Sequence, residues 1–83
     1  MKFEKNGKIY SDSKLIETIS GNVKSPSGEL VRVEFFVFEL PTVEGEVLSW
    51  GVTMNGNGRV QSMTFTDKAK MQSVLDSQSK MFV

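Results

Sequence analysis

The clearest structural signal in the chain is the stretch of residues 29–40, which reads ELVRVEFFVFEL. Its odd-numbered positions from 31 to 37 carry only valine and phenylalanine, and this period of two is typical of a β-strand. The even-numbered positions begin polar but end with Phe36, Phe38 and Leu40. We therefore expect a central strand that places large apolar side chains on both faces of a sheet.

Two Asn-Gly turns indicate hairpins on either side of this strand. The dipeptide at residues 6–7 predicts a tight turn that sets Phe3 opposite Tyr10. The run NGNG at residues 55–58 predicts a hairpin between strands at residues 46–54 and 59–65. Three dipeptides in that run could form the tight turn, and each choice changes the register by two residues. All three keep the same faces together, because only a shift by one residue would exchange them.

Residues 12–20 fit two secondary structures. Leu15, Ile16 and Ile19 could share one face of a helix, whereas the β-branched residues and the following turn at residues 25–28 favour a strand. We prefer a strand with a bulge at Gly21.

From residue 66 to residue 82 the apolar spacing changes to that of a helix. Met71, Val74 and Leu75 share one face, and Thr66 is a suitable N-cap. We expect this amphipathic helix to pack on one face of the sheet. The predicted fold is α+β: an antiparallel β-meander of about four to five strands with one C-terminal helix, forming a single small domain over residues 1–83.

The composition removes most of the chemistry that enzymes use. The chain has no cysteine and no histidine, which excludes thiol nucleophiles, cysteine-based metal sites and imidazole bases or ligands. Glu44 and Glu46 form a close pair of carboxylates that could serve acid–base chemistry or bind a cation. We interpret them instead as solvent-exposed side chains of a turn. We expect no enzymatic activity, no cofactor and no metal.

The charge distribution also bears on partners. Residues 25–50 carry five glutamates against one arginine, although the whole chain has 10 basic and 10 acidic side chains. An acidic central segment disfavours nucleic-acid binding, since phosphates need clustered cations. The longest aromatic and aliphatic run, residues 35–38, is too short for a membrane span or a signal peptide. We expect a cytoplasmic protein that does not bind membranes.

One helix can cover only one face of the sheet, so Phe36 and Phe38 need another cover. The first candidate is the N-terminal segment, through Phe3, Tyr10, Leu15 and Ile16; the other is a partner. The partner-binding residues predicted on this basis are Glu34, Phe36, Phe38, Glu39, Glu44 and Glu46. Their acidic members would steer a protein with a basic surface.

The sequence thus favours a non-enzymatic protein-binding module, which acts by occupying a surface of a larger protein. An adaptor or a stoichiometric inhibitor of the kind that mobile elements encode has this size and lack of catalytic groups. Two alternatives stay open. One is single-stranded nucleic-acid binding on an aromatic sheet face, with Phe36, Phe38, Trp50 or Tyr10 stacking on bases. The other is a homodimeric structural protein.

Overall fold

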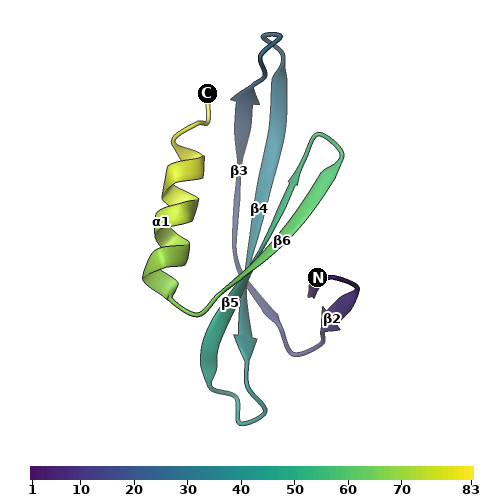
Figure 1. The fold of residues 1–83 in the computed structure, drawn as a ribbon, viewed down its shortest axis with the longest axis vertical. Coiled ribbons are helices and arrows are strands. Elements are labelled where there is room, and N and C mark those ends of the chain that lie inside the picture. Colours follow the sequence, from purple (N-terminus) through teal and green to yellow (C-terminus); the bar gives the residue numbers. More distant parts are fainter.

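The computed structural model describes residues 1–83 and has the predicted α+β fold (Figure 1). A two-stranded hairpin comes first, followed by a four-stranded antiparallel sheet in the order β3-β4-β5-β6 and then one helix. The elements are β1 (Phe3–Lys5), β2 (Lys8–Tyr10), β3 (Lys14–Lys24), β4 (Leu30–Pro41), β5 (Val47–Gly56), β6 (Arg59–Phe65) and α1 (Lys68–Ser79). The meander and its C-terminal helix are confirmed.

Both predicted hairpin turns are present. Asn6 and Gly7 have positive φ angles of 53° and 80°, and Phe3 lies opposite Tyr10 as expected. In the NGNG run the tight pair is Asn57-Gly58, with φ angles of 51° and 75°. Asparagine and glycine tolerate this left-handed backbone better than other residues, which is why the turn forms there.

The chosen turn sets the register between β5 and β6. Gly56 lies opposite Arg59, and Val52 consequently lies opposite Met63. Trp50 lies opposite Phe65 in the same ladder. The apolar side chains of the two strands therefore share the face that was predicted from their alternation.

Residues 14–24 form a strand, which resolves the ambiguity in the sequence. The bulge was predicted at the wrong residue: the register between β3 and β4 shifts between Leu15 and Glu17, not at Gly21. Gly21 has a different role, because the ring of Phe82 occupies the space that a side chain at residue 21 would fill. A glycine in a strand can signal such a close approach instead of a bulge.

The helix packs on the face of the sheet that carries the odd-numbered side chains of β4. Their shared core consists of Phe35, Val37, Val52, Met71 and Leu75, all at most 2% exposed. The N-cap is Asp67, one residue later than predicted, because its Oδ1 accepts from the backbone N–H groups of Ala69 and Lys70 at 3.0 and 3.2 Å. Helix α1 is neither long nor apolar enough to cross a membrane.

The hairpin β1-β2 covers part of the opposite face, so the sheet lies between the hairpin and α1 (Figure 1). Phe3 and Phe38 are both fully buried there, with ring centroids 5.6 Å apart, and Tyr10 packs against Phe3 at 5.2 Å. The expected intramolecular cover therefore exists over Phe38. Leu15 and Ile16 contribute little to it, since they remain 38% and 39% exposed beside the bulge.

Ser13 fastens the hairpin at the point where the chain enters β3. Its side chain is buried, and its Oγ accepts from the backbone N–H of Phe3 at 2.8 Å. The same hydroxyl donates to the backbone carbonyl of Tyr10 at 2.6 Å. One side chain thus satisfies a polar group on each strand of the hairpin.

Candidate protein-binding surface

The residues predicted to bind a partner do not form one continuous surface. Phe38 belongs to the core beneath the hairpin, whereas Phe36 is half-buried at the margin of that core. Glu34 shares the face of Phe36, but Glu39 lies opposite Trp50, on the face that α1 covers. The remaining pair, at residues 44 and 46, is exposed in the turn between β4 and β5. Only Glu34 and Phe36 are therefore neighbours on an accessible face.

A threonine lies on each side of Phe36 in the sheet. Thr18 on β3 and Thr53 on β5 lie directly opposite Phe36 in the two ladders, so all three side chains share one face. Thr53 Oγ1 lies 3.5 Å from Ser62 Oγ on β6. We call this uncovered area the open half-face and define it by Thr18, Ser20, Arg32, Glu34, Phe36, Thr53 and Ser62.

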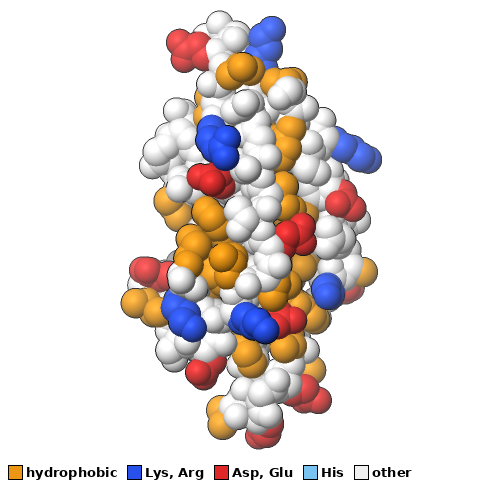
Figure 2. All heavy atoms as spheres, turned by 180° about the vertical axis from the view of Figure 1, so that it is seen from behind, with side chains coloured by type: hydrophobic (Ala, Val, Ile, Leu, Met, Phe, Trp, Pro, Cys, Tyr) orange, Lys and Arg blue, Asp and Glu red, His pale blue; other side chains and the backbone are white.

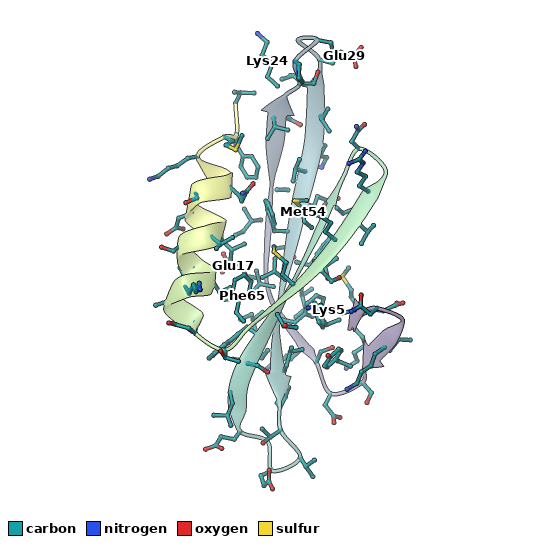
Figure 3. The ribbon with its side chains drawn as sticks, viewed as in Figure 1. Lys5, Glu17, Lys24, Glu29, Met54 and Phe65 are labelled. Carbon is teal, nitrogen blue, oxygen red and sulfur yellow. The ribbon has the colours of Figure 1, made fainter.

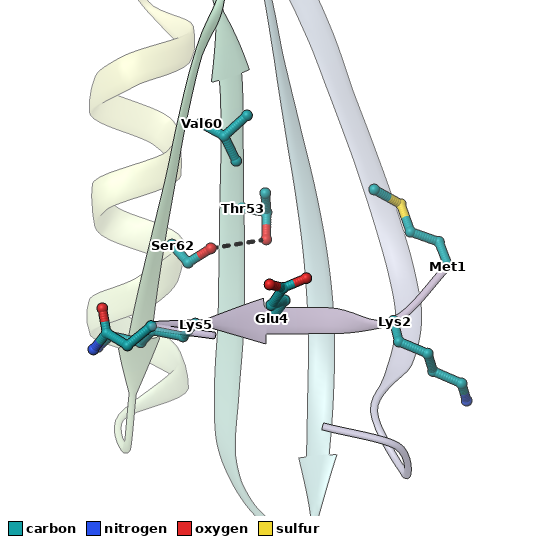
Figure 4. A pocket seen from close by; sticks show the side chains of 8 residues that line it. Met1, Lys2, Glu4, Lys5, Thr53, Val60 and Ser62 are labelled. Atoms are coloured by element: carbon teal, nitrogen blue, oxygen red, sulfur yellow. Dashed lines mark hydrogen bonds between the residues drawn. The ribbon is translucent and has the colours of Figure 1, made fainter. Parts of the chain in front are cut away.

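A hollow of about 420 Å³ lies where the hairpin meets the open half-face. Figure 4 shows β1 crossing the strands of the sheet, with Glu4 between Lys2 and Lys5. The sheet contributes Thr53, Val60 and Ser62 to the lining; the N-terminal segment contributes Met1, Lys2, Glu4, Lys5 and Asn6.

The two lysines that line this hollow donate hydrogen bonds to oxygen atoms of the protein. Lys2 Nζ donates to the carbonyl of Ser13 at 3.2 Å, and Lys5 Nζ donates to Thr64 Oγ1 at 3.4 Å. The hollow thus presents hydroxyls, a carboxylate and two ammonium groups beside two apolar side chains, Met1 and Val60, which are 70% and 65% exposed.

The acidic central segment does not make an acidic face. Glu29 lies beside Lys24 at the tip of the hairpin between β3 and β4 (Figure 3), whereas Glu44 and Glu46 lie in the turn between β4 and β5. Figure 2 shows side chains of both charges scattered among apolar ones over the face seen from behind. The expected steering of a basic partner therefore depends on individual carboxylates, of which Glu34 is the one on the open half-face.

Sequence reasoning missed the contribution of the N-terminal segment to this surface. The available signal was Gly51, a glycine inside a strand, which can mark a site where another group approaches the backbone closely. Phe3 makes that approach: its Cε1 lies 2.6 Å from the position that a Cβ at residue 51 would take. This contact packs the hairpin against β5, and the N-terminal segment thereby forms one side of the hollow.

The chain has no histidine or cysteine, and its acidic side chains nowhere gather in a group of three or more that could hold a metal ion. Comparison with known protein families, curated proteins and solved structures found no match to this chain.

Proposed function

We propose that the chain is a non-enzymatic protein-binding module that occupies a surface of a larger protein with its open half-face. The observation that carries this proposal is the partial exposure of Phe36. Two residues further along β4, Phe38 is fully buried beneath the hairpin. The hairpin does not extend over the whole of Phe36, which is only half-buried. A rigid aromatic ring with hydroxyl neighbours is the kind of anchor on which protein interfaces concentrate their binding energy.

Glu34 gives the open half-face a place for charge recognition. It lies opposite Ser20 on β3 and Asn55 on β5, so its cross-strand neighbours are polar and uncharged. Arg32 is on the same face, but its guanidinium donates to Ser20 Oγ at 3.3 Å. A basic side chain of a partner would complement Glu34 while an apolar pocket takes the ring of Phe36.

The shape of the molecule suits occlusion of a surface. Its principal extents are 48, 26 and 17 Å, so it is a flat plate with broad faces. A stable interface buries roughly 800 Å² on each partner, and a face of these dimensions is large enough for that. An adaptor or a stoichiometric inhibitor would act in this way, without catalysis.

The positions of the other aromatic rings support protein binding as the proposal in place of stacking on single-stranded nucleic acid. Stacking needs several accessible aromatic rings on one face. Phe38 is buried, and Trp50 packs on the opposite face with the α1 core. Tyr10 packs into the cluster beneath the hairpin, so Phe36 remains alone on the open half-face.

The experiment compares capture of proteins from a lysate by the wild-type chain, by Phe36→Glu and by Leu48→Glu. Leu48 is the matched control, because it is an exposed apolar residue of β5 that lies at the irregularity near the β4-β5 turn, outside the open half-face. We expect the wild type and Leu48→Glu to retain the same protein in stoichiometric amount and Phe36→Glu to lose it. Retention by all three folded chains, or by none, would refute the proposal. Thermal unfolding of each variant verifies that it is folded.

A further inference from the structure

The outer edge of β6 has no partner in this chain. In an antiparallel ladder, successive residues direct both backbone polar groups alternately to one side and the other. Gly56 and Arg59 close the hairpin, so Arg59 and every second residue after it bond to β5. Val60, Ser62 and Thr64 consequently direct their N–H and C=O groups outward, and no other segment forms a backbone hydrogen bond with them.

The other edge of the sheet, on β3, is protected in ways that β6 is not. The bulge at Ile16 interrupts its regular edge, and the backbone N–H of Val83 donates to the carbonyl of Asn22 at 2.8 Å. Charged residues also occur at both ends of β3. The β6 strand has an unbroken register with β5, contains no proline, and carries a charge only at Arg59. An unprotected, regular edge is a template for pairing with another strand.

We propose that β6 pairs in antiparallel orientation with β6 of a second copy of this chain, about a two-fold axis at Ser62. This register places Ser62 opposite Ser62 of the second copy and Val60 opposite Thr64 of the second copy. It is the register in which all the outward backbone groups of these residues find partners, and a shift along the strand leaves some of them unpaired.

The facing side chains are compatible in this register. Ser62 meets its own equivalent, and Val60 meets a threonine, so two β-branched side chains of the kind enriched in strands lie opposite each other. On the face toward α1, Gln61 would lie opposite Met63 and Arg59 opposite Phe65 of the second copy. No like charges face each other, because Arg59 is the only charged residue of the strand.

The pairing would join the candidate binding surfaces of the two copies. A two-fold axis perpendicular to the sheet keeps both open half-faces on the same side of one continuous sheet. Val60 and Ser62 line the hollow of each copy, so the second copy would bring its Val60 beside Thr64 and the Lys5 side chain that donates to it. The hollow open at the β6 edge would thereby become part of a larger surface shared by two chains.

The first measurement combines the mass in solution with amide hydrogen exchange. We expect light scattering to give twice the chain mass of 9.3 kDa. We also expect the amides of Val60, Ser62 and Thr64 to be protected to the same degree as those of Gln61 and Met63, because all would lie in hydrogen-bonded ladders. A monomer, or a dimer in which the outward amides exchange freely, would overturn the proposal.

A charge exchange tests the register itself. Residues 60 and 64 of one strand are about 13 Å apart, at roughly 3.3 Å per residue, so they cannot pair within the chain. Val60→Glu/Thr64→Glu places like charges opposite each other across the two-fold axis and should yield monomers. Val60→Lys/Thr64→Glu places opposite charges there and should yield dimers. Equal association of the two variants contradicts the register, and Phe36→Glu should remain dimeric, which separates this proposal from the proposed function.

Discussion

The ring of Phe3 lies over the backbone of Gly51, in the space that a side chain at residue 51 would occupy. Phe82 has the same relationship to Gly21 on the other face of the sheet. An aromatic ring near each end of the chain therefore packs on a strand glycine, where the missing Cβ allows close contact with the backbone. These two contacts hold the hairpin and the C-terminal segment on opposite faces.

Replacing Gly51 with alanine should displace the hairpin. A Cβ at residue 51 would lie 2.6 Å from Phe3 Cε1, and overpacking of this kind costs about 1–3 kcal/mol of unfolding free energy. Ser49→Ala is the control, because Ser49 is half-buried on the same face of the same strand. Urea unfolding should show a clear loss for Gly51→Ala and little change for Ser49→Ala; equal stabilities would mean that the ring does not depend on the glycine.

Ser13→Ala should loosen the hairpin by removing its hydroxyl bridge. The substitution leaves the backbone N–H of Phe3 without its partner, and an unsatisfied buried group of this kind costs about 1–3 kcal/mol. Amide exchange should increase in residues 3–10 more than in the four-stranded sheet. Ser11→Ala, at an exposed neighbouring position, should leave both stability and exchange unchanged. Similar exchange in the two variants would show that Ser13 does not fasten the hairpin.

Phe38→Ala and Phe36→Ala should differ in their effect on stability. Phe38 is fully buried, so its truncation should cost about 3–5 kcal/mol, a large fraction of the stability of so small a chain. Phe36 is half-buried, and its truncation removes less contact, so we expect a distinctly smaller loss. Chemical denaturation of the two variants measures this difference directly. If the loss of unfolding free energy were as large for Phe36→Ala as for Phe38→Ala, Phe36 would be a core residue and could not be the accessible anchor of the open half-face.

Trp50→Phe should be nearly neutral. Trp50 Nε1 is buried without a hydrogen-bond partner, and such a donor costs free energy that phenylalanine does not. This gain offsets the loss of ring area, so we expect a change in unfolding free energy within about 1 kcal/mol. Trp50→Ala, which removes the whole ring, should be clearly less stable. Circular dichroism is the suitable measurement, because the chain has one tryptophan and the variants lose its fluorescence. A large loss in Trp50→Phe would indicate that the indole N–H is satisfied.

Local patterns were sufficient for much of the fold. The alternation in residues 29–40 assigned Phe35 and Phe38 to opposite faces, because side chains of a strand alternate whatever surrounds it. The dipeptide at residues 6–7 predicted its turn through the backbone conformation that asparagine and glycine tolerate. The single-residue details were wrong: the bulge lies at residue 16, and the N-cap is Asp67 in place of Thr66. Thr66 and Asp67 are adjacent and both are suitable N-caps, whereas the position of the bulge depends on how β3 pairs with β4.

The sequence by itself determined which face of the sheet each side chain of β4 occupies, and it showed that a single helix could not cover both faces. Only the tertiary structure decided where the cover of the second face ends. That limit depends on the packing of Phe3 against Gly51 and Phe38, which are distant in the chain. No periodicity encodes a contact between segments that meet only when the hairpin closes onto the sheet. The burial of Phe38 and the partial exposure of Phe36 follow from that contact.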